Sequence, residues 1–199
     1  LNVRTTQIPG ARVRAMLHRA ADDVFAMSES ALLHFDGTAW TTVLTTTPAL
    51  PFVGLTATGA KIYLLARRDS VGGGVLHLVE GATHTTFDLE PTTAIWSLCA
   101  APFGLYATDR GALVRWDGHA FVRLIDTMPF EYEAIDGSSP TDVVAVGDGA
   151  VVHYDGRTFR TIHHEPGRSE LSDVRPTALD TLDTPERVVH RGDGFPARD

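Results

Sequence analysis

Hydrophobic and polar positions along this chain alternate in short runs that turn residues separate. The stretch 131–163 is the clearest, with candidate strands at 133–136, 143–146, 150–154 and 159–162. Short runs rich in Val, Ile and aromatic residues, bounded by Gly, Asp or Pro, are typical of β-strands. The run 143–146 is apolar throughout, which indicates burial on both faces. No long segment shows the spacing of an amphipathic helix, so the pattern predicts an all-β chain.

One turn motif returns along the chain. It consists of an aromatic residue, an acid, a glycine, two spacers and a second aromatic residue, and it occupies 35–40, 116–121 and 154–159, with a degenerate copy at 79–84. The spacing of the motif is about 40 residues, the period of a repeated supersecondary unit. Asp-Gly between two strand patterns is a strong hairpin signal, because glycine accepts a positive φ. Each repeat is therefore predicted to be a four-stranded antiparallel sheet.

The repeats can be aligned on their first strand. One position is always a large aliphatic residue, and the position before it is small in four of five repeats; these positions are Leu17, Leu55, Leu98, Ile135 and Leu179, preceded by Met16, Gly54, Ser97, Ala134 and Ala178. Small side chains are expected where sheets converge on an axis. Five such strands predict a five-bladed β-propeller with four-stranded antiparallel blades.

The expected boundaries follow from this alignment. Residues 1–199 form a single domain with blades at approximately 12–45, 51–90, 93–126 and 131–164, and a last blade closed by 1–9 with 171–199. Closure in this way removes unpaired sheet edges. Pro196 makes 195–199 a poor strand, since proline cannot donate to the ladder. Either the last blade has three strands or the chain is part of a longer array, and the five-bladed ring is the favoured prediction.

The run 143–156 resembles the short repeats of bacterial β-propeller proteins, described as WD40-like, Kelch-like or sialidase-type. The resemblance covers nearly the whole chain and implies the fold. Members of this broad group serve as scaffolds, lectins and occasionally hydrolases, so it does not carry an activity across. The serine that precedes the acid in the sialidase-type motif is absent here, and Phe35, Trp116 and Tyr154 stand beside the acid instead.

Composition narrows the classes of partner. The chain has 17 basic and 25 acidic residues and a net charge of −8, which argues against nucleic acid, because that partner needs a clustered basic face. The only cysteine, Cys99, excludes an internal disulfide and a thiolate-rich metal site. No apolar stretch is long enough to predict a membrane span.

The candidate chemistry lies one residue after the aliphatic column, in a predicted ring of polar side chains around the axis: His18, Thr56, Cys99, Asp136 and Asp180. Carboxylates, a histidine and a thiol could form a metal or acid–base site. Hydrogen bonding to neighbouring blades or to water explains the same residues and is the favoured interpretation. Trp96 interrupts its column, which holds Ala15, Val53, Glu133 and Thr177. Core packing is the favoured interpretation of Trp96, and surface recognition is the alternative.

The favoured prediction is a non-catalytic scaffold that recognises another protein through rim loops at 45–51, 67–74 and 127–132, without a cofactor or a metal. Two alternatives stay open. A lectin-like propeller would bind carbohydrate weakly at several blades. A five-bladed glycoside hydrolase would use two carboxyl groups such as Asp136 and Asp180, if their spacing suits hydrolysis.

Overall fold

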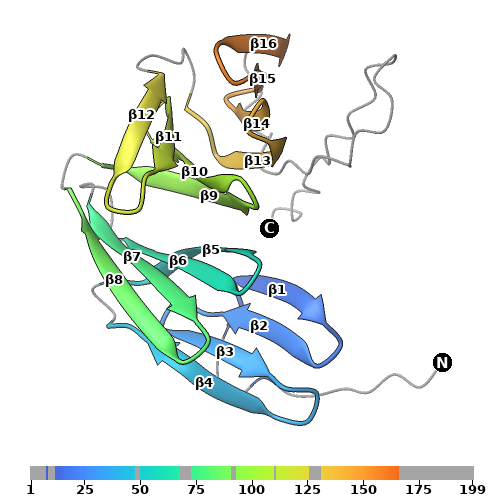
Figure 1. The fold of residues 1–199 in the computed structure, drawn as a ribbon, viewed down its shortest axis with the longest axis vertical. Coiled ribbons are helices and arrows are strands. Elements are labelled where there is room, and N and C mark those ends of the chain that lie inside the picture. The colour runs from blue at the N-terminus through green and yellow to red at the C-terminus, as the bar shows by residue number, and fades with distance from the viewer. Residues whose placement is uncertain are drawn as a thin grey trace, which may run out of the picture. The chain divides into compact units, whose positions relative to one another are not determined.

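The computed structural model describes residue 8 and residues 12–47, 50–67, 73–90, 93–109, 111–125 and 131–165. These residues form four antiparallel sheets of four strands each, in which every strand pairs with the next along the chain (Figure 1). The strands are β1 (Ala15–Ala20), β2 (Asp23–Met27), β3 (Ala31–Phe35), β4 (Trp40–Thr45), β5 (Phe52–Thr58), β6 (Lys61–Arg67), β7 (Gly74–Glu80), β8 (Thr83–Leu89), β9 (Ile95–Ala101), β10 (Gly104–Asp109), β11 (Ala112–Trp116), β12 (Phe121–Ile125), β13 (Ala134–Ser139), β14 (Asp142–Gly147), β15 (Ala150–Tyr154) and β16 (Phe159–His164). The predicted all-β fold and its four-stranded repeats are confirmed.

The chain divides into two compact units, Leu1–Pro91 and Thr92–Asp199, which are described separately below. Each unit contains two of the four sheets. The predicted closing blade, 1–9 with 171–199, lies outside the described residues apart from residue 8, so the number of blades and the closure stay predictions. The described part of the chain contains no helix with the length and apolarity that crossing a membrane requires.

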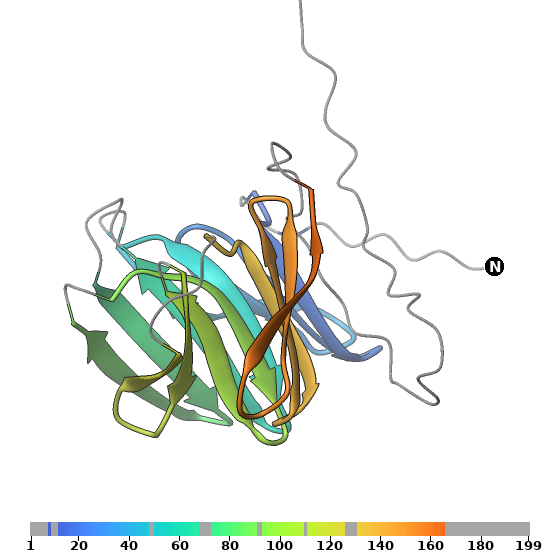
Figure 2. The ribbon, with the colours of Figure 1, turned by 90° about the horizontal axis from the view of Figure 1, so that it is seen from above.

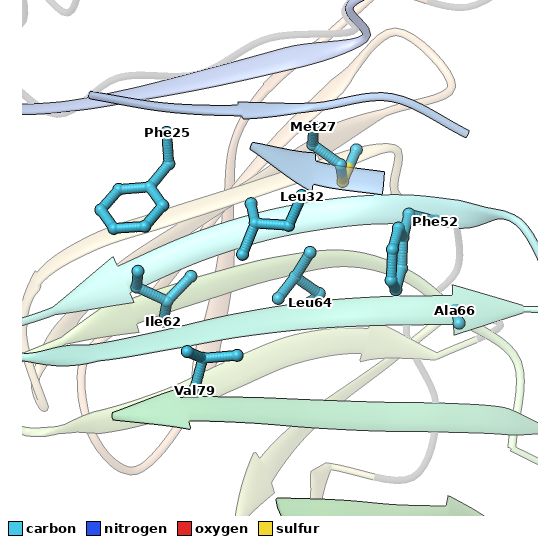
Figure 3. Packing of buried hydrophobic residues seen from close by; sticks show 8 residues of the cluster. All are labelled: Phe25, Met27, Leu32, Phe52, Ile62, Leu64, Ala66 and Val79. Atoms are coloured by element: carbon cyan, nitrogen blue, oxygen red, sulfur yellow. The ribbon is translucent and has the colours of Figure 1, made fainter. Parts of the chain in front are cut away.

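The core of the first unit lies between its two sheets. Figure 3 shows side chains of both sheets pointing toward one another; they are Phe25, Met27, Leu32, Phe52, Ile62, Leu64, Ala66 and Val79. Burial of these side chains provides the main favourable free energy of folding for the unit, because it removes apolar surface from water.

The core of the second unit follows the same plan. Cys99, Tyr106 and Leu113 of the third sheet pack with Ile135, Val143 and Tyr154 of the fourth. The second strand of this fourth sheet, β14, is buried along Val143–Gly147, as its continuous apolar run predicts. Figure 2 shows that the strands of the β13–β16 sheet, drawn in yellow to orange, are twisted, as strands in β-sheets generally are.

The Asp-Gly motifs form four-residue loops rather than the two-residue turns that Asp-Gly usually favours. In the fourth sheet the N–H of Asp155 donates to the carbonyl of Thr158 at 3.2 Å. The carboxylate of Asp155 accepts the N–H groups of Thr158 at 2.7 Å and of Arg157 at 2.8 Å, and these hydrogen bonds lower its pKa. Asp36 and Asp117 do the same in their loops. The acid of the motif therefore stabilises the loop.

The strand register corrects the sequence alignment of the first repeat by one residue. In the first sheet Leu17 lies opposite Phe25 of β2. Phe25 corresponds to the second-strand residues Tyr63, Tyr106 and Val144, which lie opposite Thr56, Cys99 and Asp136. His18 pairs with Val24 and Ala20 with Asp23, so Arg19 is the extra residue of a β-bulge in β1. The small column is then small in all four described repeats, with the members Ala15, Gly54, Ser97 and Ala134, and the aliphatic column begins with Met16 rather than Leu17.

Three of the four outer strands contain a β-bulge at the same place. In β4, β12 and β16 the register shifts at the third residue after the second aromatic residue of the motif; the bulged residues are Val43, Leu124 and Ile162. The fourth outer strand, β8, keeps one register with β7 over all seven pairs from Glu80–Thr83 to Gly74–Leu89. The bulge therefore accompanies the intact Asp-Gly motif and is missing where the motif is degenerate.

Candidate functional site

Two members of the predicted polar ring meet in the second unit. Cys99 lies on β9 and Asp136 on β13, the first strands of the third and fourth sheets. The thiol of Cys99 donates to Oδ1 of Asp136 at a sulfur–oxygen distance of 3.4 Å. The same oxygen accepts the N–H of Gly137 at 2.8 Å. The pair thus joins the first strands of two neighbouring sheets by a hydrogen bond.

The environment of Cys99 makes the thiol unreactive. Its side chain is 5% exposed. Burial and, after it, the neighbouring Asp136 carboxylate raise the pKa of the Cys99 thiol to about 12. Since the thiolate is the form that attacks electrophiles and ligates metals, the protonated Cys99 does neither near neutral pH.

Two further ring members belong to the first unit, and one lies outside the described residues. Thr56 lies half-buried on β5 of the first unit, and His18 is exposed on β1. The register places Leu17, not His18, in the row of Thr56, Cys99 and Asp136, so the alignment no longer supports a ring role for His18. Asp180 lies outside the described residues. Among the residues that the structure describes, no three His, Cys, Asp or Glu side chains gather closely enough to hold a metal ion.

Trp96 lies at the surface of the second unit because of a β-bulge. Ser97 pairs with Thr108 while Ile95 pairs with Asp109, so Trp96 is the extra residue of β9. Its side chain is 48% exposed, whereas that of Ile95 is 1% exposed. Bulges commonly re-aim a side chain in this way. In the corrected register the residue that corresponds to Trp96 in the first sheet is Arg14 rather than Ala15.

Buried polar contacts fix the backbone beside Trp96. The N–H of Ala94 donates to Oδ1 of Asp109 at 2.8 Å, and Arg123 donates to Oδ2 of the same carboxylate at 3.4 Å. Asp109 is only 4% exposed, so its two hydrogen bonds are shielded from water. This arrangement holds the start of β9 against the end of β10.

Residues 131–133, which lead into β13, lie at the same end of the second unit. The hydroxyl of Thr108 donates to the carbonyl of Tyr132 at 3.2 Å, and the N–H of Glu131 donates to Asp148 at 2.9 Å. We name this region the Trp96 end: residues 94–96, Asp109, 131–133 and Asp148. The predicted rim loops 45–51, 67–74 and 127–132 lie partly outside the described residues.

Sequence reasoning missed two histidine–aspartate pairs of the scaffold. Nε2 of His34 lies 2.9 Å from Asp23, and Nε2 of His153 lies 2.8 Å from Asp142. In both cases the acid opens the second strand of its sheet and the histidine lies eleven residues later in the third strand. That shared spacing was the available signal. Each pair joins two adjacent strands of one sheet and is a structural contact.

A third histidine contact distinguishes the second sheet. His77 is 8% exposed, and its Nδ1 lies 3.0 Å from Nε2 of His84. The ring of Phe52 meets His77 edge-on, with 5.3 Å between centroids. Burial and the nearby His84 lower the pKa of His77 to about 4, so His77 is neutral near pH 7. The equivalent position in the third strand of each other sheet is apolar and buried; it is occupied by Leu33, Val114 and Val152. His77 is therefore the polar member of this set.

Comparison with known proteins identifies relatives in structure only. No family model matches the chain, and no curated protein matches its sequence. YCF48 from Cyanidioschyzon merolae is 15% identical, over 84% of this chain and 62% of its own length, with a TM-score of 0.61. A chain of a nidogen/laminin complex is 12% identical, over 73% of this chain and 60% of its own, with a TM-score of 0.56.

The extracellular domain of the putative one-component system BT4673 from B. thetaiotaomicron is 13% identical, over 80% of this chain and 23% of its own, with a TM-score of 0.60. This chain therefore spans about three fifths of the first two relatives and a smaller part of the third. At such identities the likeness concerns the fold alone. By its fold, the chain resembles β-propeller proteins.

Proposed function

We propose that this protein is a binding module for another protein and that recognition is centred on the Trp96 end of the second unit. The exposed indole of Trp96 is the observation that carries the proposal. One similar structure of the same fold is a nidogen/laminin complex, which supports a role in protein association for this architecture.

Trp96 has the properties of an interface anchor. Tryptophan is enriched among the residues that dominate binding energy, because its large ring buries much surface at a small cost in side-chain entropy. Here the buried Ile95 and the Asp109 hydrogen bonds hold the backbone on which the indole stands. A surface that is already ordered loses less entropy when a partner binds.

Charge around the anchor indicates the kind of partner. Glu131, Glu133 and Asp148 are exposed at the Trp96 end, and the whole chain carries a net charge of −8. Complementary charge at the rim of an interface accelerates association and selects among partners. We therefore propose a protein partner with an apolar pocket for Trp96 and a basic rim.

The test compares Trp96→Ala with Val122→Ala. Both side chains are 48% exposed and both lie in the second unit, so Val122→Ala controls for the loss of exposed apolar surface. Proteins captured from the source cells by the wild-type chain are identified, and the strongest is purified for calorimetry. Trp96→Ala should weaken its binding by roughly 30-fold or more, the effect of an interface hot spot. Val122→Ala should change it less than about threefold.

Equal affinities of wild type and Trp96→Ala for the purified partner would contradict the proposal. A glycan array on the same preparation separates the lectin alternative. Binding to glycans that survives in Trp96→Ala, together with no captured protein, would favour a carbohydrate-binding role.

A further inference from the structure

The outer strand β8 differs from the other outer strands in its edge. Among the strands that the structure describes, β8 lies at the edge of the second sheet and pairs with β7 alone. It has no bulge, whereas β4, β12 and β16 each have one. Bulges, prolines and lysines are the usual devices that prevent an edge strand from pairing with another chain. The sequence of β8, THTTFDL, contains no proline, lysine or arginine.

Most of this strand is accessible. Thr83, His84, Thr85, Thr86 and Asp88 are exposed, and Phe87 and Leu89 are half-buried. A regular seven-residue strand with an exposed edge offers a row of backbone donors and acceptors to a further strand.

The turn before β8 shows which residues form that row. Glu80 and Thr83 pair across the two residues Gly81 and Ala82. Residues that flank a two-residue turn exchange hydrogen bonds with each other, and this pattern alternates along an antiparallel ladder. His84, Thr86 and Asp88 therefore direct their N–H and C=O groups toward the outer edge.

We propose that β8 pairs antiparallel with β8 of a second copy of this chain, around a two-fold axis at Thr86. In this register Thr86 faces Thr86 of the second copy, and His84 faces Asp88 twice. Cross-strand threonine pairs stabilise antiparallel strands, and an imidazole N–H of His84 can donate a hydrogen bond to the carboxylate of Asp88. A two-fold axis also requires a self-complementary patch, and the sequence of β8 provides one.

The association is expected to be weak. A contact made mainly by one pair of strands falls below the area of a standard interface, so the dissociation constant should be on the order of 10–100 µM. Sedimentation velocity of the full chain from a few micromolar to several hundred micromolar should show the dimer form.

Thr86→Lys tests the edge, because it places two lysines opposite each other at the axis. Thr42→Lys is the matched control: Thr42 is exposed and takes the same place in β4, which has a bulge at the next residue. Thr86→Lys should weaken dimerisation at least tenfold, and Thr42→Lys should leave it unchanged. Circular dichroism confirms that both variants fold.

A charge exchange tests the register. His84→Glu should weaken the dimer, because each glutamate then faces Asp88 of the other copy. Adding Asp88→Lys to His84→Glu should restore the wild-type dissociation constant to within about threefold. Restoration would support this register over any other pairing of β8.

Three outcomes would overturn the proposal: a chain that stays monomeric throughout the concentration range, a dimer that Thr86→Lys does not weaken, or a double variant that remains as weak as His84→Glu. A monomeric chain in which β8 instead adds an unrelated extended peptide, or residues of its own chain outside the described ranges, would equally overturn pairing between two copies.

Discussion

The outer hairpins of the second and fourth sheets start from the same motif and end differently. In the fourth sheet the rings of Tyr154 and Phe159 meet across the Asp155 loop, tilted by 31° with 5.0 Å between centroids, and β16 then has a bulge. In the second sheet Val79 and His84 replace this aromatic pair, the loop shrinks to two residues, and β8 runs without a bulge.

This contrast shows what the motif contributes to an outer strand. The Asp carboxylate and the two aromatic residues recur together with the bulge in the first, third and fourth sheets. Where they are lost, the strand is longer and more regular. Degeneration of a repeat can thus create an interaction surface without adding any residue that has a distinctive chemistry.

The largest expected effect comes from the glycine of the motif. Gly156 has a φ of +92°, and an added Cβ would lie 2.6 Å from Cγ2 of Thr141. Gly81 has a φ of +59° with open space around it. Gly156→Ala should therefore destabilise the chain by about 2–3 kcal/mol, through strain and a clash. Gly81→Ala should cost about 1 kcal/mol, from the left-handed conformation alone. Urea unfolding measures both, and equal losses would contradict the contrast.

The second effect concerns the buried histidine of the second sheet. The pKa of His77 is about 4 in the folded chain and ordinarily near 6.5, so the unfolded chain binds more protons between these values. Stability should therefore fall as the pH drops from 6.5 to 4. His77→Val, which restores the apolar row, should lose part of this dependence. Urea midpoints at pH 7.5 and 4.5 measure it; parallel pH profiles of wild type and variant would refute the assignment.

A smaller effect is expected for the acid of the motif. Asp155→Ala removes the acceptor of two backbone N–H groups and should lower the urea midpoint, whereas Glu80→Ala in the degenerate copy should not. The hydrogen bonds lower the pKa of Asp155, so its contribution is present above the ordinary value of 3.8 and disappears as the pH falls through the lowered one. If both variants lose the same stability, the acid has no special role.

The smallest effect concerns Cys99, the only thiol of the chain. Because the thiol is buried and its pKa is raised to about 12, iodoacetamide at pH 8 should leave the folded chain unlabelled. The chain should be labelled fully in urea. Rapid labelling without denaturant, followed by mass spectrometry, would show that Cys99 is accessible and that its pair with Asp136 opens.

The sequence predicted the sheets because turn residues and apolar runs are local signals. Asp155 and Gly156 indicated a hairpin, and the run 143–146 indicated a buried strand; both predictions are confirmed. The missed features are bulges. The bulge near Arg19 moved Leu17 into the place expected for His18, and the bulge in β9 exposes Trp96. A bulge changes pairing without changing the apolar pattern, so alignment of repeats alone cannot find it.

The candidate site was predictable only in part. The alignment placed Cys99 and Asp136 in one polar column, but their hydrogen bond, with 3.4 Å between Sγ and Oδ1, was not predicted. The contact between His77 and His84 was not predictable, because it joins two neighbouring strands and depends on their register. Contacts between strands depend on register, which the sequence specifies only indirectly.

Amide hydrogen exchange at several protein concentrations tests the contrast between the outer strands most directly. The account predicts that the amides of His84, Thr86 and Asp88 exchange more slowly as concentration rises, while those of β4, β12 and β16 exchange at unchanged rates. The account would be contradicted if exchange of the three β8 amides were independent of concentration. It would also be contradicted if the amides of β4, β12 or β16 slowed with concentration as much as those of β8.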